Sequence, residues 1–133
     1  PKPGSPAPAL GLTPYRGTPP AALAGNHETL LFFWATWCGI CKAALPDLEA
    51  ARAKRGFTVV AITDEDPEQL DTFFSSYPRP FPPVVAIDEN RRTFLDYGVS
   101  GTPTFVLIDA AGRVERQTVG YSKKKGLEVL GAS

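Results

Sequence analysis

Residues that commonly bind metals are scarce in this chain, whose 133 residues include two cysteines, one histidine and no methionine. A structural zinc site needs four nitrogen or sulfur ligands, so two thiols and His27 do not complete one. The formal net charge is zero, which leaves no electrostatic basis for binding nucleic acid. No apolar run approaches the roughly 18 residues that a membrane span requires. These absences favour a small globular domain with neither a metal nor another cofactor.

The beginning of the chain has an unusual composition. Methionine is missing even from position 1, so we expect a processed or truncated product. Residues 1–8 are rich in proline and almost free of apolar bulk, which predicts a flexible linker or tether. Such a stretch suits a segment that follows a signal or membrane anchor, and a vector remnant explains residues 1–4 nearly as well. Hydrophobic residues make up 43% of the chain, enough for residues 9–133 to form a single domain around one core.

Both cysteines lie in one short motif, Trp-Cys-Gly-Ile-Cys-Lys at residues 37–42. Two residues between cysteines suit either a zinc site or a redox-active pair, and the shortage of further ligands favours the redox pair. The apolar run at residues 29–34 predicts a strand buried on both faces, and the apolar spacing after Cys41 predicts an amphipathic helix. The cysteines are therefore expected where a buried strand turns into a helix.

A thiol at the start of that helix has distinctive chemistry. Unpaired amide groups and the helix dipole favour a negative charge there, and the thiolate is the nucleophile in disulfide exchange. We therefore predict that Cys38 attacks substrate disulfides. Cys41, one turn further into the helix, is expected to be less exposed and to resolve the mixed disulfide.

The remaining apolar patterns predict further strands and helices. Strands are expected at residues 10–15, 57–63, 83–87, 103–109 and 114–119, with a hairpin joining the last two. Helices are expected at residues 67–77, 90–97 and 122–130, with a brief helical turn at residues 19–24. Asn90 and Ser122 are expected to cap the second and third of these helices.

Two segments, in this order, resemble the thioredoxin superfamily. Residues 33–42, Phe-Trp-Ala-Thr-Trp-Cys-Gly-Ile-Cys-Lys, are similar to the thioredoxin active-site segment almost position for position, including Pro46 beyond the second cysteine. Residues 98–109, Gly-Val-Ser-Gly-Thr-Pro-Thr-Phe-Val-Leu-Ile-Asp, are similar to the segment that carries the cis-proline of the superfamily. The resemblance implies a cis peptide bond between Thr102 and Pro103, with this loop against the dithiol. It implies a site in which the catalytic residues are Cys38 and Cys41 and their neighbours are Trp37, Gly39, Ile40, Thr102 and Pro103.

The order of the elements narrows the resemblance. A helix, a strand and another helix separate Asp64 from Pro103, which is more than plain thioredoxins have and resembles the TlpA/ResA-like branch over roughly residues 7–120. That resemblance implies an α/β, thioredoxin-like fold with a central mixed β-sheet flanked by helices, an N-terminal strand extension and an inserted strand-helix unit. Members of this branch are mostly bacterial and are exported or membrane-tethered. They most often reduce disulfides in specific partner proteins, including apocytochromes c.

The chain departs from this family pattern at three places. Many thioredoxins have a buried Asp, and TlpA/ResA-like proteins often Asn, at the position of Phe32, which cannot accept a proton from Cys41. The cytochrome-maturation branch often has Glu after the loop proline, where this chain has Thr104, so an apocytochrome client is less strongly implied. The Gly39-Ile40 pair replaces the commonest Gly-Pro, and the sequence leaves open whether the dithiol reduces or oxidises its partners.

Four other features have both a functional and a structural interpretation. Trp37 suits either a core position or a contact surface beside the dithiol, and we favour the surface because Trp34 already supplies a buried tryptophan. The acidic residues 64–66 suit a metal or proton site, but a strand-end turn with charges at a helix N-terminus explains them better. The three lysines at residues 123–125 suit an anionic surface or, more simply, a solvated helix face. His27 is expected to be exposed in a turn.

We favour a monomeric thiol:disulfide oxidoreductase that acts on disulfide-containing protein substrates outside the cytoplasm and is recharged by a membrane or soluble electron donor. One alternative is a cytoplasmic thioredoxin-like reductase, whose gene would encode neither a signal nor an anchor. The other is a non-enzymatic thioredoxin-fold binding module or copper chaperone. Copper-handling relatives generally use a CxxxC motif with a distal histidine, and this sequence has neither.

Overall fold

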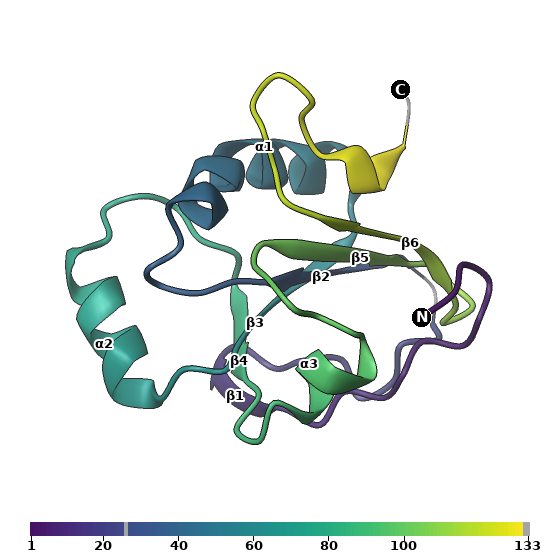
Figure 1. Cartoon of the computed structure of the whole chain (residues 1–133), viewed down its shortest axis with the longest axis horizontal. Helices are drawn as coiled ribbons and strands as arrows, with labels where there is room; N and C mark the ends of the chain where they lie inside the picture. Colours follow the sequence, from purple (N-terminus) through teal and green to yellow (C-terminus); the bar gives the residue numbers. More distant parts are fainter. Residues whose placement is uncertain (26, 132–133) are drawn as a thin grey trace.

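The computed structural model describes residues 1–25 and 27–131, which form a six-stranded sheet with helices on both faces. The strands lie in the order β1-β4-β3-β2-β5-β6 (Figure 1). Their bounds are β1 Thr13–Arg16, β2 Thr29–Phe33, β3 Thr58–Thr63, β4 Val84–Ile87, β5 Thr104–Ile108 and β6 Val114–Val119. Strands β2, β3 and β4 are parallel, whereas β1, β5 and β6 pair antiparallel with their neighbours. The predicted mixed sheet is therefore confirmed.

Strand β2 lies in the middle of the sheet, and all five of its residues are buried. Its side chains alternate between two apolar layers, as the period of a strand requires. Leu30 and Phe32 face the layer that contains residues of α1 (Gly39–Arg55), α2 (Pro67–Ser76) and the short 3₁₀ helix η1 (Glu128–Leu130). Leu31 and Phe33 face the layer that contains Phe94 of α3 (Arg92–Asp96). The end of β2 is thus fixed from both sides where the chain enters the cysteine motif.

Helix α2 follows the acidic turn that the sequence places after β3. The carboxylate of Asp66 accepts a hydrogen bond from the amide of Gln69, whose side chain accepts one from the amide of Asp66, and Pro67 occupies the first turn. This reciprocal arrangement satisfies amides that the helix leaves unpaired. The predicted helix at residues 67–77 is confirmed, with Asp66 as its cap. No helix in the part of the chain that the structure describes is long and apolar enough to cross a membrane.

The predicted C-terminal helix at residues 122–130 is wrong. The chain turns at residues 123–125, Ser122 and Gly126 form a short antiparallel bridge, and only η1 is helical. Three consecutive lysines at the expected helix start are repelled by the positive end of the helix dipole. Gly126 adopts a left-handed conformation (φ 66°), which interrupts a right-handed helix. A loop therefore replaces the helix and lies near the start of α1.

Three smaller predictions also need correction. Residues 19–24 form bends rather than a helical turn, because a residue before proline disfavours helical backbone and two prolines are adjacent at residues 19–20. The N-terminal strand is Thr13–Arg16 rather than residues 10–15. Asn90 does not cap α3; the buried carboxylate of Asp88 accepts a 2.8 Å hydrogen bond from the amide of Phe94 instead.

The predicted tether at residues 1–8 makes defined contacts with the turn before β6. The amide of Gly4 donates to the carbonyl of Val114 at 2.7 Å, and the amide of Ala7 donates to the carbonyl of Gly112 at 2.9 Å. Ala7 also packs against the α3 side of the core. Residues 4–7 of the predicted tether therefore contact the domain. The boundary between linker and domain stays a prediction.

Candidate active site

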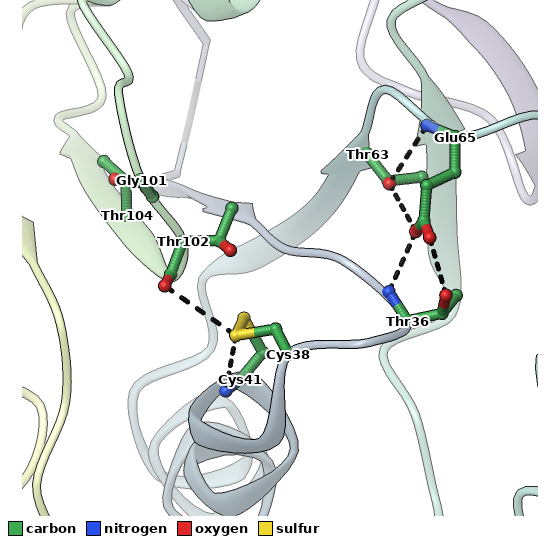
Figure 2. Close-up of a disulfide and its surroundings, with 8 residues drawn as sticks. All are labelled: Thr36, Cys38, Cys41, Thr63, Glu65, Gly101, Thr102 and Thr104. Atoms are coloured by element: carbon green, nitrogen blue, oxygen red, sulfur yellow. Dashed lines mark hydrogen bonds between the residues drawn. A yellow bond between two sulfur atoms is a disulfide. The ribbon is translucent and has the colours of Figure 1, made fainter.

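The two cysteines form a disulfide at the start of α1, one turn after the buried strand β2 ends. Cys38 is the N-cap residue in extended conformation, and its Sγ accepts a 3.1 Å hydrogen bond from the amide of Cys41 (Figure 2). Amides at a helix N-terminus have no partner within the helix and stabilise a negative charge. The predicted junction of strand and helix is confirmed, and it places the Cys38 sulfur where a thiolate is favoured.

The two sulfurs differ in their surroundings. Cys38 is 5% exposed and Cys41 is 1% exposed, so the second cysteine is the more shielded, as expected. Both belong to the same apolar layer as Phe32. Burial opposes the ionisation of a thiol, whereas the helix N-terminus favours it. Only Cys38 accepts the capping hydrogen bond, so the local geometry favours the thiolate at Cys38.

The loop before β5 closes one side of the disulfide. The Thr102–Pro103 peptide bond is cis, which confirms the bond that the family resemblance implies. The carbonyl oxygen of Thr102 lies 3.7 Å from the Sγ of Cys38 (Figure 2). A reduced thiol can donate a weak hydrogen bond to this oxygen, whereas a thiolate cannot. The carbonyl of Thr102 and the amide of Cys41 therefore favour opposite protonation states of Cys38.

Thr104, which occupies the position where a Glu often follows the loop proline, is fully buried. Its hydroxyl donates a 2.6 Å hydrogen bond to the carbonyl of Gly101, and the amide of Gly120 binds the carbonyl of Pro103 at 2.8 Å. These bonds hold the cis-proline loop against β6. Thr104 therefore braces the loop from inside instead of presenting a charge to a partner.

A buried carboxylate supports the loop on the other side of the motif. The carboxylate of Glu65 accepts hydrogen bonds from the amide and hydroxyl of Thr36, at 2.8 and 2.6 Å, and from the hydroxyl of Thr63 at 2.8 Å (Figure 2). Thr36 lies two residues before Cys38, so Glu65 ties the cysteine motif to the end of β3. The sequence gives no sign of this role, because an acidic turn before a helix does not indicate which carboxylate points inward.

The other two acids of this turn have surface roles. Asp66 caps α2, and Asp64 pairs with Arg91, whose guanidinium also lies 4.8 Å above the ring of Phe94. No group of three or more potential His, Cys, Asp or Glu metal ligands occurs among the described residues. The structural interpretation of residues 64–66 is therefore confirmed for Asp64 and Asp66, whereas Glu65 serves the cysteine loop.

Phe32 fills the position where the superfamily often places a polar residue. Its side chain is fully buried, and its ring stacks between those of Trp34 and Phe105, at centroid distances of 6.5 and 5.4 Å. An aromatic hydrocarbon in this position provides no acceptor for a proton from Cys41. The departure from the family pattern at Phe32 therefore leaves the apolar layer around the cysteines without a proton acceptor at this position.

The outer side of the disulfide is open and partly apolar. Trp37 is 76% exposed and Ile40 is 52% exposed, whereas Trp34 is 1% exposed, so the surface position predicted for Trp37 is confirmed. A pocket of about 120 Å³ adjoins Trp37 and Thr102. A larger groove of about 570 Å³ begins at Gly39 and Ile40, between the two cysteines. His27 is exposed, as expected, and lies outside both.

Comparisons with known proteins agree with this geometry. The Redoxin family model matches residues 2–131. ResA, a thiol-disulfide oxidoreductase of Bacillus thuringiensis (strain Al Hakam), is 35% identical over 102 residues, which are 74% of this chain and 58% of ResA. The thiol:disulfide interchange protein HelX of Rhodobacter capsulatus is 31% identical over 121 residues, 88% of this chain and 68% of HelX. This chain therefore spans little more than half the length of the ResA that it matches.

Solved structures show the same fold over nearly the whole chain. A DsbE-like thiol:disulfide interchange protein from Chlorobium tepidum matches with a TM-score of 0.80 and 33% identity, covering 93% of this chain and 89% of the other. A thio-disulfide isomerase from Thermus thermophilus matches with a TM-score of 0.70 and 25% identity, covering 99% of both chains. The fold, the cysteine pair at the helix start and the cis-proline beside it agree with the family match: this chain belongs to the Redoxin family, within the thioredoxin superfamily.

Proposed function

We propose that this protein is a thiol:disulfide oxidoreductase that reduces disulfides in partner proteins. The observation that carries the proposal is the Cys38–Cys41 pair, capped by the amide of Cys41 and lying beside the cis-proline loop on an open apolar surface. Relatives named as thiol:disulfide oxidoreductases and interchange proteins share the fold and support the same chemistry.

The reaction proceeds through two successive thiol–disulfide exchange steps. In the reduced protein the Cys38 thiolate attacks one sulfur of the substrate disulfide, a mixed disulfide forms, and the other substrate sulfur leaves as a thiolate that takes up a proton. The Cys41 thiolate then attacks the Sγ of Cys38 and releases the second substrate thiolate. The substrate gains two electrons, and the protein is left with the Cys38–Cys41 disulfide seen here.

The surrounding residues divide this work. The capping amide of Cys41 stabilises negative charge on Cys38 in the first step, and again when Cys38 is the leaving group in the reverse direction. Glu65 and Thr36 keep the loop in the position from which Cys38 attacks. Because Phe32 accepts no proton, the proton of Cys41 passes to water or to the departing substrate thiolate.

The proposed setting is extracytoplasmic, with either a periplasmic or a membrane-tethered protein. The TlpA/ResA-like resemblance supports this location, partner proteins that include apocytochromes c, and a membrane or soluble dithiol as electron donor. The donor restores the dithiol by the same two exchanges in reverse. We propose the reducing direction because this branch of the superfamily most often works as a reductase.

Trapping of mixed disulfides tests the proposal. Cys41→Ser should accumulate covalent complexes with partner proteins through Cys38, because no second thiol resolves them. Cys38→Ser, the matched control, should trap few, because Cys41 is shielded. Equal recovery by both variants, or recovery by neither, would contradict the assigned roles.

Equilibration with glutathione tests the direction. A reductase should have a potential below that of protein disulfide isomerase, at roughly −180 mV. A value near that of the strong oxidant DsbA, about −120 mV, would contradict the reducing direction while leaving disulfide exchange in place.

A further inference from the structure

The groove of about 570 Å³ begins at the cysteine motif and is built from three separate segments. The start of α1 forms its floor, the loop after α2 forms one wall and the loop after β6 forms the other. Its lining residues are Gly39, Ile40, Lys42, Ala43, Pro46, Tyr77, Arg79, Tyr121, Ser122 and Lys123. Neither cysteine lines the groove, but Gly39 and Ile40 lie between Cys38 and Cys41 in the sequence, so one end of the groove is next to the cysteine motif.

Each of the three segments contributes one positive charge. Lys42 comes from α1, Arg79 from the loop after α2 and Lys123 from the loop after β6. None of the three takes part in an ion pair within the described residues. The lining contains no Asp or Glu. In a chain whose net charge is zero, this groove is a local concentration of positive charge.

Asp47 and Glu49 lie near the groove, and each already contacts a neighbouring side chain. Asp47 accepts a hydrogen bond from the hydroxyl of Tyr121, which keeps Tyr121 in place as part of the wall. Glu49 pairs with Arg52 at 3.0 Å. The charge of Asp47 offsets at most one of the three cations, since the tyrosine hydroxyl that binds it is neutral. The groove therefore keeps an excess of positive charge.

The walls and floor also offer apolar surface. Ala43, Pro46 and Tyr77 line the same groove as the cations, and Ile40, in the cysteine motif, is 52% exposed. Apolar contacts hold an extended peptide, and charges at the rim select its sequence and speed its arrival. The combination suits a polypeptide better than a small anion, because the three cations come from three separate segments and share the groove with apolar residues.

We propose that this groove binds an acidic segment of the protein substrate next to its reactive cysteine. The inference rests on the proposed function and deepens it: the protein would select disulfides that have Asp or Glu residues nearby in the sequence. Lys42, Arg79 and Lys123 would contact those carboxylates while Cys38 attacks the sulfur. Of the three lysines at residues 123–125, only Lys123 lines the groove. All three are exposed, as predicted, but they lie on a turn and not on the predicted helix face.

Three disulfide-bonded peptides of equal length test this inference, with Glu, Gln or Lys beside the cystine. At about 0.15 M salt, where screening acts over roughly 8 Å, the reduced wild-type protein should reduce the Glu peptide about tenfold faster than the Lys peptide. At about 1 M salt the ratio should fall below about two, since screening then acts over roughly 3 Å. Each peptide rate is divided by the rate with hydroxyethyl disulfide, an uncharged substrate that reports on the dithiol alone.

The double variant Arg79→Glu/Lys123→Glu should reverse the preference, so that the Lys peptide reacts about tenfold faster than the Glu peptide. The double variant Lys2→Glu/Lys54→Glu is the control for the same change in net charge, since Lys2 is also exposed and outside the groove. Lys54 is exposed near the end of α1, roughly 18 Å along the helix from Lys42 at 1.5 Å per residue, and lies outside the groove. This control should retain the wild-type ratio.

The outcomes separate the groove from the chemistry. Turnover of hydroxyethyl disulfide without any preference among the peptides would overturn the groove's role and leave the proposed function standing. Turnover of none of the substrates would overturn the proposed function, and the groove's role with it. A double variant that keeps the wild-type preference but no longer binds vesicles of an anionic phospholipid would overturn the peptide groove in favour of a membrane surface.

Discussion

Two tryptophans, three residues apart in the sequence, show how the inner side of this site differs from its outer side. Trp34 is 1% exposed and packs against Phe73, Phe74 and Phe81, at ring centroid distances of 5.3, 6.2 and 4.6 Å. Trp37 is 76% exposed. The disulfide lies at the boundary between them. The comparison shows that the fold determines the inner side through packing, whereas the outer side is left uncovered for a partner.

The sharpest test of this comparison is truncation of each tryptophan. Trp34→Ala should lower the free energy of unfolding by about 3–5 kcal/mol, because it removes a fully buried ring from an aromatic cluster. Trp37→Ala should change it by less than about 0.5 kcal/mol, as expected for an exposed position. Urea unfolding of both variants provides the measurement. Similar losses for the two variants would show that the sides are not energetically distinct.

Phe32→Asp places an acid on the inner side, where relatives often have a polar residue. The free energy of unfolding of this variant should fall by about 3 kcal/mol or more, because the change removes apolar burial and buries a polar group. Burial raises the pKa of an acid, which makes it a better acceptor for a thiol proton, so reduction of a model disulfide near neutral pH should be faster.

Phe32→Asn is the matched control, because asparagine resembles aspartate in shape and polarity but has no ionisable group. Turnover is compared well below the unfolding midpoint of each variant. A folded Phe32→Asp protein that is no faster than Phe32→Asn would show that proton transfer at this position does not limit the reaction.

Glu65→Gln weakens the support of the cysteine loop from the β3 side. The carboxylate accepts three hydrogen bonds, and hydrogen bonds to a charged group contribute more to stability than neutral ones. The free energy of unfolding of this variant should therefore fall by about 2 kcal/mol. The alkylation rate of reduced Cys38 should also change, because Thr36 is released. Glu68→Gln, an exposed change in the first turn of α2, is the control and should leave that rate unaltered. An unchanged alkylation rate in Glu65→Gln would show that Glu65 stabilises the fold but does not position Cys38.

The smallest effect is expected at Tyr121, which lines the groove, and only at high pH. Burial and the hydrogen bond to Asp47 raise the pKa of Tyr121 from 10.0 to about 12. Below pH 10 both the folded and the unfolded chain keep this proton, and the stabilisation is complete. As the pH rises through 10 toward 12, only the unfolded chain loses the proton, so stability falls.

Tyr121→Phe should therefore lose less stability than the wild-type protein between pH 10 and 12, a difference that urea midpoints across this range measure. The pKa of Tyr97 is also raised, mainly by burial, but this residue is present in both proteins and cancels in the comparison. Identical pH profiles would show that Tyr121 does not hold its proton through the contact with Asp47.

The sequence predicted the local features of the site better than the features that depend on distant contacts. Local patterns located the buried strand β2, the helix start at Cys38 and the exposed Trp37, because periodicity and helix-end chemistry act over a few residues. The cis bond at Pro103 came from family resemblance, since composition alone favours trans.

Features that depend on distant contacts were missed. Glu65 points inward because Thr36 and Thr63 supply donors, and only the fold brings these residues together. The loop that replaces the expected helix at residues 122–130 forms part of the groove. The cap signal at Ser122 predicted a helix there, because such a signal does not include the repulsion between three lysines and the positive end of the helix dipole. The groove therefore became visible only in three dimensions.

The central claim is that Cys38 is the nucleophile of a redox-active pair, and the pH dependence of thiol alkylation tests it most directly. The reduced protein is treated with iodoacetamide over a range of pH, and the labelled cysteine is identified by mass spectrometry. Cys38 should react faster, with a pKa below the usual value of about 8.5 for a free thiol. A faster reaction at Cys41, with the lower pKa of the two, would contradict the account.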